Sequence, residues 1–259
     1  MTRPSLGRLS LPSAAGRERG EVIFSFYDDE NDEFFDVAKA TLKYFRPAVM
    51  QVTGLCFSYP QADVFSNLSL HISAGVTLVQ GGDGRGKTTL LRLLAGDLKP
   101  RSGQILPSFW PGALANGLTS LSPVDMPHLQ VFWMDPRSTE HDSINARSYF
   151  DNQAKRWPGF DHPGLAALIE GLSLVGFLDK PLYMLSTGSK RKLWLAAAFA
   201  SNANVALLDD PFAALDNPSI RFVTGVLRSM ALQTQRAVVI SGYDAPDYVL
   251  LAGLIDLGA

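Results

Sequence analysis

Gly81-Gly82-Asp83-Gly84-Arg85-Gly86-Lys87-Thr88-Thr89 is a glycine-rich segment that indicates the fold class of the chain. It satisfies the pattern of a glycine, four free positions and then Gly-Lys-Ser/Thr. Glycines let the backbone turn tightly, so that its N–H groups can approach a polyphosphate. The pattern assigns the charge of Lys87 to the β- and γ-phosphates and the hydroxyl of Thr88 to Mg²⁺. The stretch therefore predicts a site for a nucleoside triphosphate.

The residues on either side of this stretch indicate a strand, a loop and a helix. Residues 76–80 form a short apolar and β-branched run that is typical of a buried strand. Residues 89–95 are apolar at helical spacing, and Gly96 closes the segment. In such an arrangement the N-terminus of the helix faces an anion. An ordinary glycine-rich turn between strand and helix is the alternative, and the flanking pattern disfavours it.

Length and composition narrow the possible classes of protein. A chain of 259 residues allows one large α/β domain or two small ones, and a hydrophobic content of 46% supports a substantial core. The net charge of −2 indicates no general affinity for nucleic acid. A single cysteine, Cys56, excludes an intramolecular disulfide and argues for a reducing compartment. No apolar run is long enough to cross a bilayer, so work at a membrane requires docking onto another component.

The composition divides the chain into an N-terminal extension, residues 1–49, and a domain, residues 50–259. Residues 1–20 are rich in Arg, Ser, Pro and Gly and lack the apolar core of a signal peptide, so we expect a largely disordered tail. An acidic cluster at 28–33 is interpreted as a solvated charge run, with an interaction tail as the alternative. Met50 is a candidate alternative start, which mass analysis of the native N-terminus would test.

From residue 50 onward the pattern is that of an α/β domain. Residues 144–182 read as mostly helical, with apolar side chains at amphipathic spacing, and residues 193–200 continue a helix. The amphipathic positions are Leu165, Leu168, Ile169, Leu172 and Val175. Strands are expected at 51–58, 69–72, 76–80, 205–208, 237–240 and 251–257, with strand-like and loop-like pieces in 105–135.

Two adjacent carboxylates, Asp209 and Asp210, follow the apolar run 205–208. A parallel strand buried in a sheet has this composition, and ligands bind at the carboxyl ends of such strands. Asp209 is therefore placed to hold Mg²⁺ beside Thr88, directly or through water, and Asp210 to polarise an attacking water. A simple boundary between strand and turn before Pro211 is the alternative, and the upstream glycine loop favours the metal site.

A third segment, Leu185-Ser186-Thr187-Gly188-Ser189, precedes an apolar helix. Ser186 is a good helix N-cap and Gly188 leaves the backbone accessible. A capped helix start without a binding role is the alternative interpretation. Lying between a phosphate loop and a carboxylate strand, the segment resembles the Leu-Ser-Gly-Gly-Gln signature of the ATP-binding cassette (ABC) family. Residues 57–60 resemble the family's aromatic segment, in which Tyr59 stacks on adenine. Residues 213–216 resemble the loop after the carboxylate strand, and the resemblance covers about residues 50–258.

The resemblance implies a P-loop α/β fold of ABC type. Its parts are a mixed sheet core that carries ATP, an antiparallel β subdomain and a helical subdomain inserted at about residues 136–200. It also implies a head-to-tail dimer with a second ABC subunit, identical or different, around two ATP molecules. Ser186, Thr187 and Gly188 of one protomer would face the γ-phosphate held by the other. An integral membrane permease would be the second partner and would place the protein on the cytoplasmic face of the membrane.

Four positions depart from the family pattern. Asp210 replaces the catalytic glutamate and is one methylene shorter, which costs rate where water has to be positioned. Tyr243 stands at the switch histidine, and a phenol with a pKa near 10 is a poor proton shuttle at neutral pH. Asp135 is the best candidate for the metal-contacting glutamine. Thr187 and Ser189 replace glycine and glutamine in the signature.

We therefore expect ATP–Mg²⁺ binding with slow hydrolysis that drives a transporter. A soluble ABC-type ATPase and a nucleotide-dependent switch, both without a permease, are the alternatives. The expected catalytic residues are Asp210 and Tyr243, and the expected metal ligands are Thr88, Asp209 and Asp135. The expected nucleotide-binding residues are Tyr59, Gly81, Gly82, Asp83, Gly84, Arg85, Gly86, Lys87, Thr88 and Thr89.

Overall fold

The computed structural model describes residues 8–10, 21–23, 46–108 and 129–258, and the chain divides into two compact units. The sheet unit comprises Lys39–Ser138, Ala203–Ala213 and Val226–Ala259. The helical unit comprises Met1–Ala38, Thr139–Asn202 and Ala214–Gly225. Most of the N-terminal extension, including the acidic cluster at 28–33, lies outside the described residues. Within it, two short strands pair antiparallel, β1 (Arg8–Ser10) and β2 (Glu21–Ile23).

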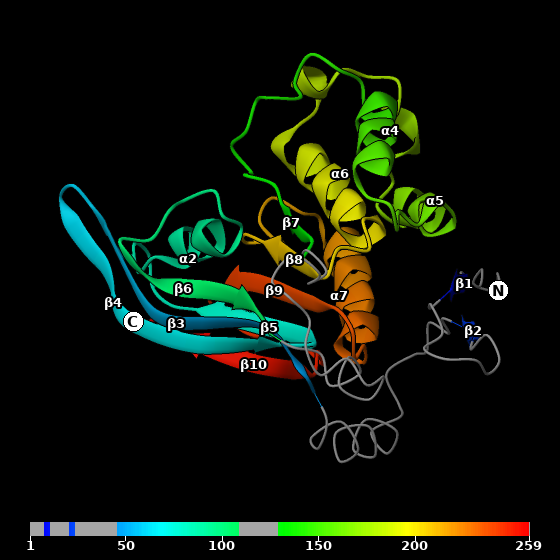
Figure 1. Ribbon diagram of the computed structural model, residues 1–259. Helices are drawn as coiled ribbons and strands as arrows, with labels where there is room; N and C mark the ends of the chain where they lie inside the picture. The colour runs from blue at the N-terminus through cyan, green and yellow to red at the C-terminus, as the bar shows by residue number, and fades with distance from the viewer. Residues whose placement is uncertain (1–7, 11–20, 24–45, 109–128, 259) are drawn as a thin grey trace. The chain divides into compact units, whose positions relative to one another are not determined.

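A five-stranded parallel sheet forms the core of the sheet unit (Figure 1). Its inner strands are continuous apolar runs because both faces of such a sheet are covered. All the carboxyl ends meet at one edge, so the residues that follow these strands are brought together there. The strand order is β10 (Leu251–Asp256), β5 (Gly75–Gln80), β9 (Ala237–Gly242), β8 (Val205–Leu208) and β7 (Val131–Trp133).

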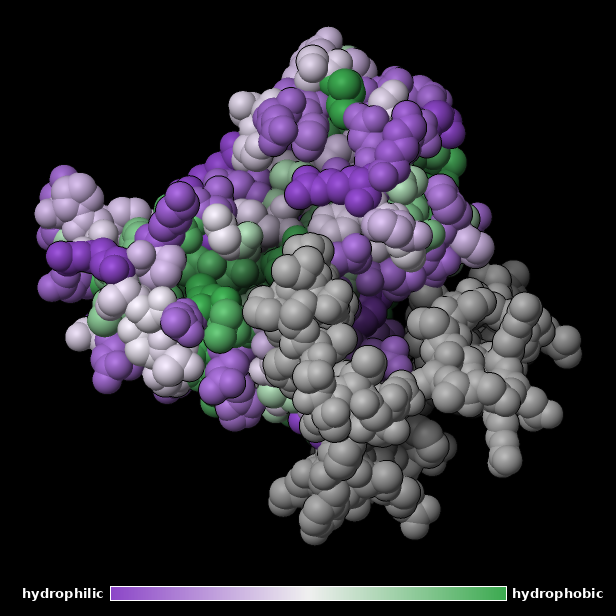
Figure 2. Space-filling model, viewed as in Figure 1, coloured by the Kyte–Doolittle hydropathy of each residue, from purple (hydrophilic) through white to green (hydrophobic). Residues whose placement is uncertain are grey.

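A three-stranded antiparallel sheet completes the sheet unit, in the order β4 (Ala62–Ser73), β3 (Ala48–Tyr59) and β6 (Ser102–Pro107). Buried positions in β3 alternate over Leu55 and Phe57, as expected for a sheet with one face on the core. Hydrophobic colour gathers on the viewed surface over β6, where Leu106 is exposed (Figure 2).

Helix α2 (Lys87–Leu94) packs its leucines into a core shared by both sheets of this unit. Leu90, Leu91 and Leu93 are almost completely buried, in one cluster with residues of β3, β4, β5, β8 and β9. The helix ends where Gly96 adopts a φ of +75° and donates its N–H to the carbonyl of Leu93, 3.0 Å away. The expected strand, glycine loop, helix and closing glycine are therefore all present.

The helical unit is built around α6 (Thr187–Ala200), against which α4 (Ala146–Arg156) and α5 (His162–Gly171) pack. Two short 3₁₀ turns, Val175–Phe177 and Leu182–Met184, lie between α5 and α6. The expected amphipathic helix extends too far in sequence, because α5 ends at Gly171 and Ser173 has a φ of +56°. Val175 is consequently 61% exposed rather than on a buried face.

A further helix, α7 (Asn217–Ala231), was not predicted from the sequence. Its start is capped by Asp216, whose Oδ1 accepts the N–H of Ser219 at 2.9 Å.

In the parts of the chain that the structure describes, no helix is long and apolar enough to cross a membrane.

Candidate nucleotide site

The phosphate loop connects β5 to α2 and depends on glycine at position 86. Gly86 has a φ of +92°, and a Cβ there would lie 2.6 Å from Cγ1 of Val64. Gly84 also has a positive φ, +75°, but faces open space. Helix α2 starts at Gly86 without a side-chain cap. Its first N–H groups therefore point into the loop, which is the arrangement that binds a phosphate.

Lys87 points back over the loop. Its Nζ donates to the carbonyl oxygens of Gly81 at 2.5 Å and Gly82 at 2.9 Å. The ring of Tyr243 covers the same ammonium group, with its centroid 4.6 Å from Nζ. This charge is thus held at the mouth of the loop, where a phosphate would meet it.

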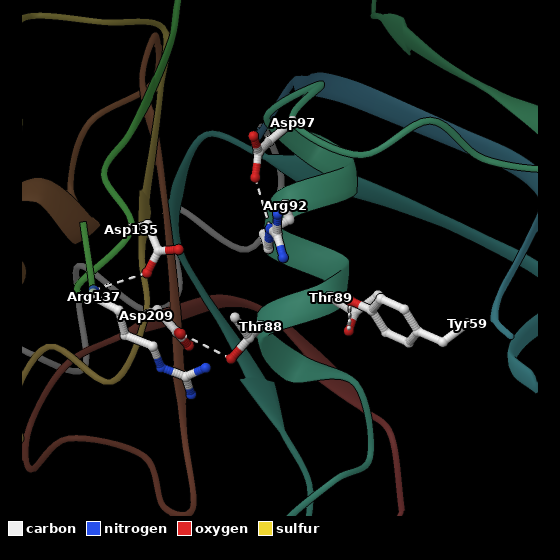
Figure 3. Close-up of polar contacts among 8 residues, drawn as sticks. All are labelled: Tyr59, Thr88, Thr89, Arg92, Asp97, Asp135, Arg137 and Asp209. Atoms are coloured by element: carbon white, nitrogen blue, oxygen red, sulfur yellow. Dashed lines mark hydrogen bonds and ion pairs between the residues drawn. The ribbon is translucent and has the colours of Figure 1, made fainter. Parts of the chain in front are cut away.

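Asp209 and Thr88 meet at the edge of the parallel sheet, as expected. The hydroxyl of Thr88 donates to Oδ2 of Asp209 at 2.8 Å (Figure 3). A hydroxyl and a carboxylate side by side are the oxygen ligands that Mg²⁺ prefers, and Mg²⁺ takes its other ligands from nucleotide phosphates and water. The two residues therefore fit the ion and would hold it, and the ion when bound would supply positive charge against the charge of the phosphates.

Ser241 is a site residue that sequence reasoning missed. It is 2% exposed, and its Oγ donates to Oδ1 of Asp209 at 2.6 Å. The same Oγ accepts the backbone N–H of Asp210 at 2.9 Å. The signal that could have revealed it is the register of β8 and β9, where Leu208 pairs with Ile240, so that the next residues along lie opposite each other. Ser241 therefore orients both carboxylate positions.

Asp210 is exposed and has a φ of +46°, a left-handed conformation that aspartate tolerates better than most residues. Tyr243 follows β9 and is 55% exposed. Its hydroxyl donates a short hydrogen bond to Oδ1 of Asp83 in the phosphate loop. That hydrogen bond raises the pKa of Tyr243 above its ordinary value, so the phenol is a neutral donor at physiological pH.

Asp135 lies two residues beyond the end of β7, the strand that pairs with β8. Because Trp133 pairs with Leu207, Asp135 and Asp209 occupy corresponding places past their strands. Oδ1 of Asp135 accepts the backbone N–H of Arg137 at 2.9 Å (Figure 3). Among the described residues no group of three or more His, Cys, Asp or Glu side chains is arranged to hold a metal by itself. A metal at this edge would therefore depend on ligands from the nucleotide.

Tyr59 lies beside the start of α2. Its hydroxyl is 3.3 Å from Oγ1 of Thr89 in the first turn of that helix (Figure 3). Its ring packs edge-on against Phe57 with centroids 5.0 Å apart and is 39% exposed. A partly exposed aromatic ring beside the start of this helix is suited to stack on a base.

The signature segment starts α6 in the helical unit. The Oγ of Ser186 accepts the N–H of Ser189 at 3.1 Å, and Ser186 and Thr187 are exposed. A Cβ on Gly188 would lie 2.3 Å from the carbonyl oxygen of Ala214, so a larger residue does not fit there. The segment is thus an exposed, capped helix start with a close backbone contact behind it.

The chain is similar to known proteins both in sequence and in fold. Residues 65–213 match the sequence model of the family described as ABC transporter. The chain is 33% identical over 182 residues to the cytochrome c biogenesis ATP-binding export protein CcmA 2 of Salmonella paratyphi A, covering 68% of this chain and 80% of that protein. It is 30% identical over 175 residues to CcmA of Pseudomonas savastanoi pv. phaseolicola, covering 67% and 78%. A solved ABC transporter ATP-binding protein of Pyrococcus furiosus shares the fold with a TM-score of 0.61 at 24% identity, over 80% of this chain and 96% of that one.

Proposed function

The chain belongs to the ABC transporter family, and on that premise we propose that it is the ATP-binding subunit of a transporter which binds ATP–Mg²⁺, dimerises head to tail and hydrolyses ATP slowly. ATPase activity coupled to transport is the activity of this family. The Mg²⁺, the dimer, the permease and the slow rate are the parts that we propose.

The observation that carries the proposal is the arrangement of Lys87, Thr88 and Asp209 around one loop. Lys87 supplies the positive charge, and the hydroxyl of Thr88 touches the carboxylate of Asp209 at 2.8 Å. Phosphate and metal ligands therefore meet at the start of one helix, which is the requirement for holding a nucleoside triphosphate. The partly exposed ring of Tyr59 would receive the base.

Slow hydrolysis is argued from the two catalytic positions. Asp210 has a shorter side chain than glutamate, so its carboxylate reaches less far toward an attacking water. The raised pKa of Tyr243 keeps the phenol protonated at neutral pH, because its hydrogen bond to Asp83 favours the neutral form. Asp210 is therefore poorly suited to activate an attacking water, and Tyr243 is poorly suited to accept a proton.

Dimerisation and the permease are argued from the signature segment and from the relatives. The exposed start of α6 presents N–H groups and Ser186 to a partner, and a helix N-terminus attracts a charged phosphate. The relatives of 30% identity or more given above are named as export proteins of cytochrome c biogenesis. We propose the same class of small exporter ATPase for this chain, docked peripherally on the cytoplasmic face through its membrane partner.

The central test is Lys87→Ala. Because a charged hydrogen bond to phosphate contributes about 1.5–3 kcal/mol, the dissociation constant for ATP–Mg²⁺ should rise about 10- to 150-fold. Lys99→Ala is the matched control, since Lys99 is an exposed lysine beyond the end of the same helix. Titration calorimetry measures both, and unchanged affinity in Lys87→Ala would refute the site.

The partner is tested separately. The full chain, purified from detergent-solubilised membranes of its own cells, should bring an integral membrane protein with it and should dimerise in ATP when sedimented. A protein that binds ATP yet stays without a membrane partner would favour the soluble alternative.

A further inference from the structure

Asp83, Tyr243 and Lys87 form a cluster that the resemblance does not account for. The phenol of Tyr243 donates to the carboxylate of Asp83, and its ring lies over the ammonium of Lys87 with a centroid distance of 4.6 Å. Asp83 and Tyr243 are 160 residues apart in the chain, so only the fold brings them together. A carboxylate in a phosphate loop is unexpected on electrostatic grounds, since it repels the ligand.

The chemistry of the phenol limits what Tyr243 can do. A tyrosine hydroxyl has one O–H and can donate one hydrogen bond at a time. In this structure that donor is given to an anion, Oδ1 of Asp83, which is the stronger kind of hydrogen bond. A terminal phosphate bound at Lys87 would reach the same hydroxyl, because the phenol ring already covers the lysine ammonium.

We propose that Asp83 competes with the terminal phosphate of the nucleotide for the hydrogen bond that Tyr243 donates, so that the pair determines how strongly the site prefers a triphosphate to a diphosphate. This inference rests on the proposed function of the same site. In the absence of a γ-phosphate the phenol stays with Asp83. When a triphosphate binds, the hydroxyl is contested by two anions, and the charge of Asp83 opposes the added phosphate charge.

Two effects of Asp83 on nucleotide affinity can be separated by whether they require the hydroxyl of Tyr243. One extra unit of negative charge at a separation of about 7 Å in water-like surroundings weakens binding about threefold. Replacing the carboxylate by a neutral amide also weakens the competing hydrogen bond, which adds a further factor of about three to five. The first effect does not need the hydroxyl of Tyr243, whereas the second does.

The test is a double-mutant cycle of wild type, Asp83→Asn, Tyr243→Phe and the double variant. Calorimetry gives dissociation constants for Mg²⁺ with the non-hydrolysable analogue AMP-PNP and with ADP. Asp83→Asn should tighten AMP-PNP binding about tenfold when Tyr243 is present but only about threefold in the Tyr243→Phe background. ADP affinity should change less than about twofold throughout, because the contested phosphate is missing.

Tyr248→Phe is the matched control. Tyr248 is 68% exposed, and its ring lies 5.0 Å from the guanidinium of Arg228 rather than on the loop, so both dissociation constants should stay unchanged. Equal effects of Asp83→Asn in the two backgrounds, or equal effects on AMP-PNP and ADP, would overturn the competition. A wild-type protein that binds neither nucleotide would overturn the proposed function and this inference with it.

Discussion

Asp210 combines the catalytic role that we propose for it with a conformational demand on its backbone. Its φ of +46° places it in the left-handed region, where aspartate is favoured over most side chains. Its N–H is held by Oγ of Ser241, which also holds Asp209. The backbone at this position is therefore determined by the sheet edge, and the length of the side chain is what remains to limit the chemistry.

Asp210→Glu should raise the rate of ATP hydrolysis about tenfold or more, because the longer side chain restores about an ångström of reach. The left-handed backbone should make the same variant less stable by about 1 kcal/mol. Steady-state phosphate release and urea unfolding measure the two effects. Asp210→Asn is the control of equal size and should stay slow. A folded glutamate variant that is no faster than wild type would show that reach does not limit turnover.

At the same scale, the site was predictable wherever a residue belongs to a local motif. Thr88 and Asp209 each follow a recognisable local pattern, and the structure has them in hydrogen-bond contact. Their role as metal ligands stays a prediction. Ser241 could not be read in this way, since its role comes from the pairing of β8 with β9. The partnership of Asp83 and Tyr243 likewise depends on where two distant loops meet.

At the scale of elements, the loop after β8 ends in a cap that sets the start of α7. Oδ1 of Asp216 accepts the N–H of Ser219 at 2.9 Å, and Lys192 of α6 donates to Oδ2 at 2.9 Å. The hydrogen bonds from Ser219 and then Lys192 hold the pKa of Asp216 well below its usual range. The ionised carboxylate thus connects the start of α7 to the second turn of α6.

This cap predicts a pH dependence of stability. A lowered pKa means that the contribution of Asp216 is present above its unfolded pKa of about 4 and is lost as the pH falls through its lower folded value. Asp216→Asn keeps a capping oxygen but does not titrate and loses the ion pair. Thermal unfolding should show the variant melting below wild type at pH 7, with the gap closing as the pH falls below about 4. A gap that persists in acid would exclude the carboxylate charge as the cause.

The helices and strands differ in how well their bounds were predicted from the sequence. The buried strand 205–208 was predicted with the observed bounds, because its short apolar run ends at two aspartates and Pro211, which favours a strand over a helix. Helix α7 was missed although its signal is present in the sequence. Asp216 and Pro218 stand at its start, and apolar residues follow at helical spacing, at Ile220, Val223, Leu227 and Met230. The helix predicted past the end of α5 has a different cause. Its apolar spacing continues past a left-handed residue, Ser173, that composition does not reveal.

At the scale of the whole molecule, the residues just before Met50 take part in the fold of the sheet unit. Strand β3 starts at Ala48, and Val49 and Met50 are 7% and 1% exposed. The carbonyl of Pro47 accepts the N–H of Ala74 at 3.0 Å, and that of Val49 accepts the N–H of Ser108 at 2.9 Å. Residues just before Met50 therefore belong to the fold of this unit, which bears on the hypothesis of a start at Met50.

Two shortened chains test this point, one beginning at Arg46 and one at Met50. Without Val49 the second loses about 1.5–3 kcal/mol of apolar burial and about 0.5–1.5 kcal/mol for each lost hydrogen bond. It also places a charged α-amino group at a buried position, which adds a desolvation cost. Since a domain is stable by only about 5–15 kcal/mol, urea unfolding should show the Met50 chain strongly destabilised relative to the Arg46 chain. Because the nucleotide site lies in this unit, ATP affinity should follow the same order. Equal stability of the two chains would mean that β3 needs nothing before Met50.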